Sequence, residues 1–270
     1  MWVAIAREMI LVGMVLWKIL VRSSAWSLLR PARSVFPGDL SQARTLPGAV
    51  RFQSRVRSSR RRNEMSWRCH GRDNAELVAN LQRHYILTSP EAATAMLKID
   101  RGHFVPDGSP YDDCPQSIGY GVTISAPHMH AYCVSMLADR LKPGMRVLDV
   151  GSGSGYLSAV FGIMVGENGK AVGVEVIPEL VERSKRDIKR TPAGPLLEKG
   201  IIEIHAGDGK LGWPAGAPYD AIHVGAAASE LPKELVKQLK PGGRMVVPVG
   251  SYAQDLVLLL SCTCIGFAPF

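Results

Sequence analysis

Three glycines, Gly151, Gly153 and Gly155, follow the apolar stretch 147–150, whose only charged member is Asp149. With the mainly apolar stretch 158–165 after it, this pattern is typical of a strand, a turn and a helix that cradle a nucleotide-like ligand. Glycines lack a Cβ, so the backbone can approach such a ligand closely. The G-x-G-x-G spacing is shorter than the G-x-G-x-x-G turn that seats a pyrophosphate. It suits S-adenosylmethionine, a methyl donor that carries no phosphate.

Two further acidic residues stand where the rest of an adenosine ligand would need them. Glu175 lies near the end of a second β-branched stretch, residues 170–176, and 20 residues after Gly155. This is the separation expected of a carboxylate that accepts hydrogen bonds from both ribose hydroxyls. Asp208, between two glycines after the stretch 201–206, is placed to accept the amino group of an adenine. The plainer interpretations are a solvated acid for Glu175 and an Asx turn for Asp208.

The elements that must hold these residues alternate between strand and helix. Residues 219–225 and 244–250 have the composition of buried strands, and residues 230–240 have a helical pattern that ends at Pro241. The alternation predicts an α/β fold with a doubly wound, mostly parallel sheet and helices on both faces. Ligands bind such sheets at the carboxyl ends of the strands. The glycine turn and both acids fall at that edge, which predicts one adenosine-binding site.

Two helices are expected before the sheet. The helical pattern is found in residues 73–80 and 91–99. Thr88 or Ser89 would cap the second helix, with Pro90 in its first turn.

A stretch rich in turn residues and small polar groups, residues 113–131, follows and opens a predicted helix that runs to about Arg140. Ser125 has the type and position of a helix N-cap. His128 and His130 suggest a metal pair at first sight. Residues two apart cannot share one helical face, so we expect no metal site.

Part of this stretch closely resembles the protein-L-isoaspartate (D-aspartate) O-methyltransferase family: Pro-Gln-Ser-Ile-Gly through Thr-Ile-Ser-Ala-Pro-His-Met-His-Ala, residues 115–131. Three later motifs match the same family in order: Leu-Asp-Val-Gly-Ser-Gly-Ser-Gly from Leu148, Pro-Tyr-Asp-Ala-Ile-His-Val-Gly-Ala-Ala-Ala from Pro218, and Leu-Lys-Pro-Gly-Gly-Arg from Leu239. The first motif is specific to the family, and the others are shared more widely among methyltransferases. The resemblance covers about residues 65–250 and implies a Rossmann-like, S-adenosylmethionine-dependent methyltransferase.

The resemblance also implies roles for single residues. Ser125 matches the family's active-site serine, which orients the acceptor carboxylate at the point of methyl transfer. Residues 224–227 resemble the stretch beside the peptide acceptor. Together with the glycine turn, the predicted cofactor-binding set is Val122, Thr123, Ile124, Ser125, His130, Asp149, Gly151, Gly153, Ser154, Glu175, Asp208 and Gly209.

The implied reaction is methyl transfer from S-adenosylmethionine to the free carboxylate of L-isoaspartyl and D-aspartyl residues in damaged proteins, which starts their repair. A carboxylate is already nucleophilic and a sulfonium is an activated donor, so alignment matters more than a strong base. Two other hypotheses stay open. One is a variant that binds S-adenosylmethionine or isoaspartyl proteins without turnover. The other is an adenosine-dependent enzyme that methylates a different acceptor or uses NAD.

After Gly250 the resemblance is expected to fail. The family continues with antiparallel strands that close the sheet and finish the pocket. Here residues 255–260 are a candidate sixth strand, and no stretch is a convincing seventh. We therefore predict that the final antiparallel strands are incomplete and leave an exposed edge.

Positive charge is concentrated in residues 1–64, which contain 12 Lys and Arg against 3 Asp and Glu. Residues 65–270 contain 20 against 21, so the net charge of +8 does not mark this part as a nucleic-acid binder. We predict two parts, a basic extension (1–64) and a methyltransferase domain (65–270). Five cysteines without a C-x-x-C pattern favour a reducing compartment.

The extension has three interpretations. Residues 9–21 are apolar except for Lys18, a stretch too short and too interrupted for a confident membrane span. The first interpretation is a mitochondrial presequence, which an amphipathic helix resembles when Arg- and Ser-rich, acid-poor sequence follows it, here through the arginine run 60–62. A signal anchor is the second interpretation, and a start at Met65 is the third. The domain is expected in the cytosol as a monomer, with a mitochondrial location or membrane contact only if the extension is retained.

Overall fold

The computed structural model describes residues 49–51, 69–250 and 255–261. All of them lie in the second of two units into which the chain divides, Thr45–Phe270. The amphipathic segment and arginine run of the predicted extension, and the alternative start at Met65, lie outside the described residues. The boundary between residues 64 and 65 therefore stays a prediction. None of the helices in the described part has both the length and the apolar composition that a membrane crossing requires.

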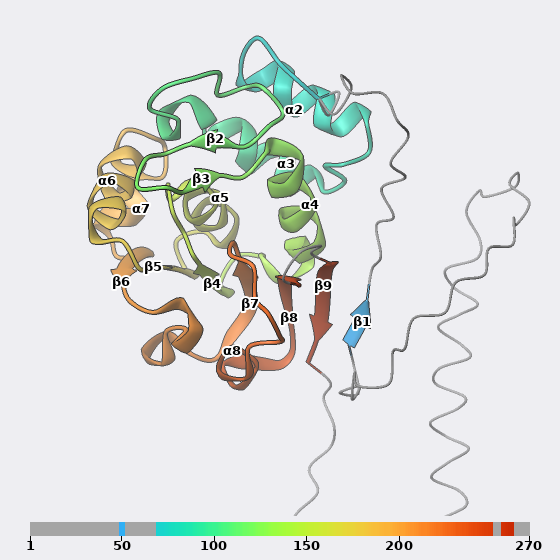
Figure 1. Cartoon of the computed structure of the whole chain (residues 1–270), viewed down its shortest axis with the longest axis vertical. Helices are drawn as coiled ribbons and strands as arrows, with labels where there is room; N and C mark the ends of the chain where they lie inside the picture. Colours follow the sequence, from blue (N-terminus) through green and yellow to red (C-terminus); the bar gives the residue numbers. More distant parts are fainter. Residues whose placement is uncertain (1–48, 52–68, 251–254, 262–270) are drawn as a thin grey trace, which may run out of the picture. The chain divides into compact units, whose positions relative to one another are not determined.

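A seven-stranded sheet forms the centre of the described structure (Figure 1). Its strands, in spatial order, are β1 (Ala49–Arg51), β9 (Asp255–Leu260), β8 (Leu239–Val249), β7 (Tyr219–Val224), β4 (Arg146–Val150), β5 (Lys170–Glu175) and β6 (Ile202–Ala206). The strands from β8 to β6 run parallel, whereas β9 and β1 are antiparallel to their neighbours. From β4 the chain builds outward to β6 and then returns to β7. Such a reversal leaves a ligand-binding crevice at the carboxyl ends of the strands.

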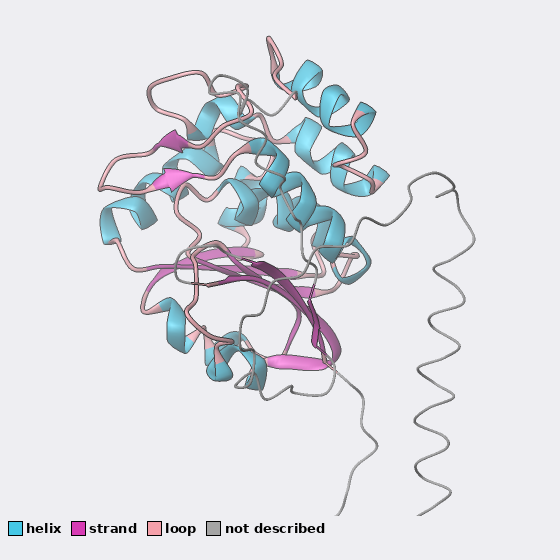
Figure 2. Cartoon of the chain, turned by 45° about the vertical axis from the view of Figure 1, so that its right-hand side comes forward, coloured by secondary structure: helices cyan, strands magenta, loops and turns pink. Residues whose placement is uncertain are grey.

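The central strands of the sheet divide their apolar side chains between two cores. In β4, Val147 packs into one hydrophobic cluster and the next residue, Leu148, into the other. In β7, Ala221 and Ile222 divide in the same way. Because successive side chains point to opposite faces, both faces of the sheet are apolar and must be covered. Figure 2 shows helices on both faces, which confirms the predicted doubly wound α/β fold.

The larger core is covered by most of the helices, and the smaller core by the last one. The helices are α2 (Asn74–Arg83), α3 (Pro90–Lys98), α4 (Pro127–Leu137), α5 (Tyr156–Val165), α6 (Pro178–Lys189), α7 (Gly194–Glu198) and α8 (Lys233–Lys237). The two predicted N-terminal helices are present. Asp73 caps α2 and Ser89 caps α3, where Pro90 occupies the first turn as expected.

The prediction of a helix over residues 230–240 is wrong in length. Only Lys233–Lys237 is helical, and β8 begins at Leu239, before the Pro-Gly-Gly stretch that the sequence pattern placed after the helix. This stretch is a bulge within the strand, since the register against β7 shifts before it resumes at Arg244. Gly242 has a φ of +78°, which favours glycine, and its N–H donates to the carbonyl of Ser261.

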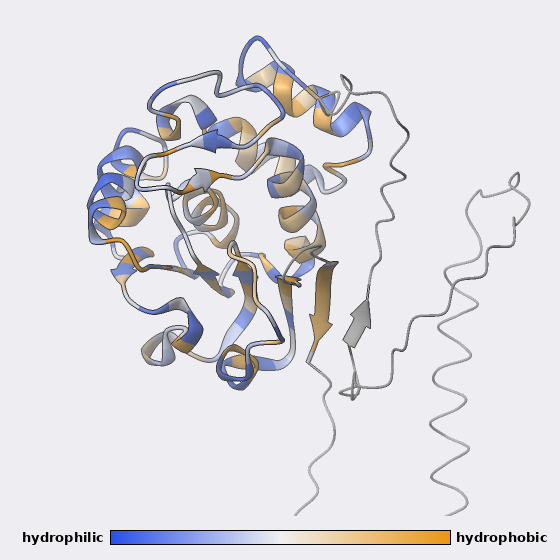
Figure 3. Ribbon diagram, viewed as in Figure 1, coloured by the Kyte–Doolittle hydropathy of each residue, from blue (hydrophilic) through white to orange (hydrophobic). Residues whose placement is uncertain are grey.

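The outer edge of the sheet contains a strand that the sequence did not predict. β9 is the expected sixth strand, and its apolar character after Asp255 is visible over most of its length (Figure 3). Beyond it lies β1, with Val50 opposite Leu258. The seventh strand is therefore three residues long and comes from the predicted extension. It precedes the parallel core in sequence, whereas the family pattern places the closing strands after it.

Candidate active site

The glycine turn bends sharply between β4 and α5. Gly151, Gly153 and Gly155 have φ angles of +72°, +50° and +81°, in the left-handed region that favours glycine. The N–H of Gly151 donates to the carbonyl of Val174 at 2.8 Å, which ties the turn to β5. A Cβ at Gly155 would lie 2.8 Å from Cβ of Ser184, so this glycine also lets α6 pack closely.

Glu175 supports the same turn from the end of β5. Its Oε2 accepts from the N–H of Gly153 at 2.9 Å, and its Oε1 accepts from the N–H of Ile177 at 3.1 Å. The side chain is buried beside the turn. Each carboxylate oxygen has a further lone pair, so these bonds leave acceptor capacity. The contact between Glu175 and a ribose stays a prediction.

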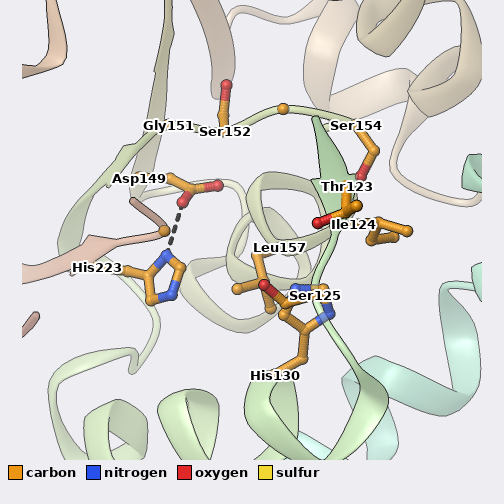
Figure 4. A pocket seen from close by; sticks show the side chains of 12 residues that line it. Thr123, Ile124, Ser125, His130, Asp149, Gly151, Ser152, Ser154, Leu157 and His223 are labelled. Carbon is orange, nitrogen blue, oxygen red and sulfur yellow. Dashed lines mark hydrogen bonds and ion pairs between the residues drawn. The ribbon is translucent and has the colours of Figure 1, made fainter. Parts of the chain in front are cut away.

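A buried ion pair lies next to the turn (Figure 4). Asp149 accepts from Nδ1 of His223 at 2.8 Å and from the hydroxyl of Ser158 at 2.6 Å. Burial alone would lower the pKa of His223, but its hydrogen bonds to Asp149 and Cys133 outweigh burial and raise the pKa to about 10. His223 is therefore an imidazolium at neutral pH, and Asp149 neutralises its charge.

Ser125 lies between a small hairpin and a helix. β2 (Gln116–Ser117) pairs with β3 (Thr123–Ile124), and the chain then enters α4 at Pro127. The interpretation of Ser125 as an N-cap is wrong, because the cap position is Ala126, whose side chain makes no capping hydrogen bond. Pro127 at the first helical position has no N–H to satisfy. Within the described part of the chain, the half-buried hydroxyl of Ser125 makes no hydrogen bond.

A pocket separates the hairpin from the glycine turn. Ser125 and His130 lie on one side of it, and Asp149 and His223 on the other (Figure 4). Its lining comprises Thr123, Ile124, Ser125, His130, Asp149, Gly151, Ser152, Gly153, Ser154, Leu157, His223 and Gly225. The fold thus brings together eight of the twelve predicted site residues.

The other four predicted residues lie outside this lining: Val122, Glu175, Asp208 and Gly209. Asp208 is exposed, and its Oδ1 accepts from the N–H of Lys210 at 2.9 Å to begin a short 3-10 helix, as an Asx-type turn does. Gly209 packs against the end of β4, since a Cβ there would lie 2.7 Å from Cγ1 of Val150. The adenine contact of Asp208 and Gly209 stays a prediction.

Sequence reasoning assigned no role to three lining residues: Ser152, Leu157 and His223. His223 carried a signal, since it places an imidazole in a strand that is buried at every position. Ser152 is flanked by the turn glycines and belongs to the same motif. Leu157 had no distinguishing signal, because α5 is apolar over most of its length.

The two histidines of α4 have separate partners. Both the backbone N–H and Nδ1 of His128 bond to Oδ1 of Asp113, at 2.9 and 2.8 Å. Nδ1 of His130 lies 3.2 Å from Nη1 of Arg101 instead. Their different partners agree with the argument that residues two apart do not share a helical face.

These features define a class of protein. A parallel sheet with a switch point, a glycine turn of positive φ and an acid at the tip of the next strand are typical of Rossmann-like enzymes that bind an adenosine cofactor. The residues fit S-adenosylmethionine better than a phosphate-bearing cofactor, since the described lining contains no Lys or Arg. In the described structure Oγ of Ser152 is buried without a partner, as expected where a polar ligand supplies one.

Comparison with known proteins then places the chain in one family. Residues 72–261 match the family model described as Protein-L-isoaspartate(D-aspartate) O-methyltransferase. The chain is 60% identical over 184 residues to protein-L-isoaspartate O-methyltransferase 1 of Arabidopsis thaliana, covering 68% of this chain and 80% of the relative. It is 49% identical over 185 residues to the Caenorhabditis elegans enzyme, covering 68% and 81%. The chain belongs to the protein-L-isoaspartate O-methyltransferase family.

A solved structure supports the same placement. The crystal structure of a protein-L-isoaspartate O-methyltransferase from Plasmodium falciparum, in complex with S-adenosyl-L-homocysteine, matches with a TM-score of 0.65 and 38% identity over 70% of this chain and 89% of that one. The family match ends at residue 261, so the expectation that the resemblance fails after Gly250 is wrong. The match continues through β9, the last strand of the sheet along the chain.

Proposed function

We propose that this protein transfers the methyl group of S-adenosylmethionine to the free carboxylate of L-isoaspartyl and D-aspartyl residues in damaged proteins. Family membership supports the reaction and the cofactor. The observation that carries the proposal is the hydroxyl of Ser125, which has no partner in the described chain and faces the glycine turn across the pocket. It is positioned to donate to an acceptor carboxylate.

The reaction needs alignment and no net proton transfer. Bound S-adenosylmethionine supplies a methyl group activated by a positively charged sulfur. One carboxylate oxygen forms a bond to the methyl carbon as the carbon–sulfur bond breaks, which gives a methyl ester and S-adenosylhomocysteine. Because the acceptor is ionised at neutral pH, no general base is required. Alignment of this kind can supply about 7–11 kcal/mol of barrier lowering in favourable cases.

The charge balance of the pocket suits this reaction. Burial, together with the nearby guanidinium of Arg101, lowers the pKa of His130 well below its ordinary value, so its ring is neutral. His223 is charged but neutralised by Asp149. The residues that line the pocket therefore add little net charge. The positive charge of the sulfonium and the negative charge of the acceptor carboxylate are both lost when the methyl group is transferred.

The test uses the full chain, tritiated S-adenosylmethionine and an isoaspartyl peptide, with the normal aspartyl peptide of the same sequence as control. Base-labile methyl ester on the isoaspartyl peptide alone is the expected result. Calorimetry measures cofactor binding in parallel. Binding without ester would replace the proposal by a binding protein of the same fold. Ester on both peptides would indicate a carboxyl methyltransferase of broader acceptor range.

We further propose that the protein acts as a monomer in the cytosol without a nucleic-acid partner. The near balance of charge over residues 65–270 supports the absence of a nucleic-acid partner. Fractionation of cells that express the full chain or residues 65–270, each with a C-terminal tag, tests the location. Mitochondrial or membrane recovery of the full chain alone would assign a targeting role to residues 1–64. Light scattering of the purified protein tests the monomer.

A further inference from the structure

Arg101 is a buried cation that bonds to Ser125 and His130, two residues that line the pocket, without lining it itself. Its side chain is among the largest that are fully buried, at 1% exposure. The guanidinium donates to three groups from separate segments. Nε donates to the carbonyl of Pro110 at 2.9 Å and Nη2 to the carbonyl of Ser125 at 2.7 Å. Nη1 lies 3.2 Å from Nδ1 of His130.

All of these partners are neutral acceptors. In the part of the chain that the structure describes, no carboxylate forms an ion pair with Arg101. Burial lowers its pKa to about 10, so it keeps its proton at neutral pH. Asp113 favours the charged form through space, and the guanidinium carbon lies 5.7 Å from the centroid of the Tyr156 ring, but neither bonds to it directly. A buried charge without a directly bonded counter-charge destabilises a fold, and most proteins avoid one. A residue that serves only packing would not require a guanidinium here.

The contact with His130 fixes the state of that ring. A guanidinium can only donate, so Nδ1 of His130 must be the acceptor, and the proton of the neutral ring resides on Nε2. The ring stacks on Tyr156, with centroids 5.2 Å apart, which holds its orientation. His130 lines the pocket, and the remaining ring nitrogen is therefore a donor.

From this geometry, and on the basis of the proposed function, we infer that Arg101 is a positioning residue for methyl transfer. It holds the main chain of Ser125, and so the placement of the hydroxyl that orients the acceptor carboxylate. It also keeps His130 neutral and in one tautomer beside the methyl donor. Lysine cannot replace it, because one ammonium group does not reproduce a planar fork with three fixed donor directions.

The pH dependence of a variant without Arg101 follows from the groups that act on His130. Arg101 from the segment before the hairpin, His223 on β7 and, through space, His128 on the same helix disfavour its protonation, and the ring stacks on Tyr156 of α5. His128 is paired with Asp113, and His223 with Asp149. Burial is the largest cause of the low pKa of His130 and remains in the variant, but loss of Arg101 removes the second cause, so this pKa rises toward its ordinary value. A protonated His130 beside the sulfonium then weakens S-adenosylmethionine binding at low pH.

The experiment compares the full-length wild type with Arg101→Lys and Arg101→Met in the methyl-transfer assay, from pH 5 to pH 8.5. We expect kcat to fall about 10- to 100-fold in both variants, the range for losing hydrogen bonds from a charged donor. In Arg101→Met, KM for S-adenosylmethionine should also rise as the pH falls, which the wild type should not show. Adding His130→Gln to Arg101→Met should abolish this pH dependence.

A matched control separates positioning from stability. Arg244 is also mostly buried, but it clamps the carbonyl of Met136 and the carboxylate of Asp139 away from the pocket. Arg244→Met should lower stability without making KM depend on pH. NMR of the wild type bound to S-adenosylhomocysteine provides a test that needs no variant. His130 should carry its proton on Nε2 and should not titrate between pH 5 and pH 8.

The outcomes distinguish two failures. A wild type that forms no ester overturns the proposed function itself. An active wild type whose Arg101 variants keep its kcat and its pH profile overturns the positioning role. A His130 ring protonated on Nδ1, or one that titrates near pH 6.5, overturns it as well.

Discussion

The two sides of the pocket are held in place by different means. The glycine turn on one side is shaped by backbone conformation: three positive φ angles, a hydrogen bond to β5 and the support of Glu175. The Ser125 side depends on distant side chains, among them Arg101, which reaches the carbonyl of Ser125 from 24 residues upstream. The first side is encoded in a few consecutive residues. The second depends on contacts that only the folded chain creates.

This difference has a consequence for mutation. Changes on the glycine-turn side alter both the stability of the sheet and the cofactor site, because the same residues serve both. Changes at Ser125 alter chemistry with little effect on stability, because its hydroxyl bonds to nothing in the described chain. Four predictions test this contrast, from the largest expected effect on stability to the smallest.

Asp149→Ala should have the largest effect. It leaves His223 buried without its counter-charge and removes the partner of Ser158. Loss of one member of a buried pair destabilises a protein by about 3–5 kcal/mol. Urea unfolding of the variant, of His223→Ala and of the double variant gives the coupling energy. A cost below about 1 kcal/mol would show that the pair is not coupled to the fold.

Gly155→Ala should destabilise the protein by about 2–4 kcal/mol, from a left-handed backbone and a close contact with Ser184. Gly200→Ala is the matched control, since Gly200 has a φ of +70° and nothing within 4 Å of an added Cβ. The control should cost only the backbone strain, about 1–2 kcal/mol. An equal loss of stability for both variants in thermal unfolding would mean that α6 moves to accommodate the added methyl group.

Stability should fall as the pH rises from about 6.5 to about 10. The folded protein raises the pKa of His223 from 6.5 to about 10, so it binds one proton more than the unfolded chain in this window. The stabilisation is complete below pH 6.5 and is lost by pH 10, with a slope of at most about 1.4 kcal/mol per pH unit. His223→Asn should remove this component of the slope. An unchanged slope would assign it to other groups.

Ser125→Ala should change the free energy of unfolding by less than about 0.5 kcal/mol. Turnover on the isoaspartyl peptide should fall about 10- to 100-fold, since a hydrogen bond to a charged acceptor is lost. The affinity for S-adenosylmethionine, measured by calorimetry, should change little. Unchanged turnover would exclude Ser125 from orienting the acceptor.

The sequence predicted the parallel core of the sheet well. The strands at residues 146–150, 170–175, 202–206 and 219–224 agree closely with their apolar stretches, because strands buried on both faces are continuously apolar. The helix at residues 230–240 was overestimated, since a glycine bulge inside β8 has the same composition as a helix end. β1 was missed because three residues carry too little pattern.

The site was predictable to the extent that its residues are adjacent in sequence. The glycine turn and the hairpin each contribute several lining residues from one motif. Arg101 and His223 were not assigned roles, because their importance lies in partners far along the chain: Ser125 and His130 for Arg101, and Asp149 for His223. Long-range hydrogen bonds leave no local periodicity from which to infer them.

The short strand β1 affects the solubility of the protein, which should differ between the full chain and a product that begins at Met65. It occupies the hydrogen-bonding edge of β9, a strand composed largely of leucine and valine. A product that begins at Met65 lacks this strand and presents the same edge to other molecules. Unpaired apolar edges recruit strands from neighbouring chains, so the shorter product should self-associate in a concentration-dependent manner. The choice of initiation codon would then set the solubility of the product.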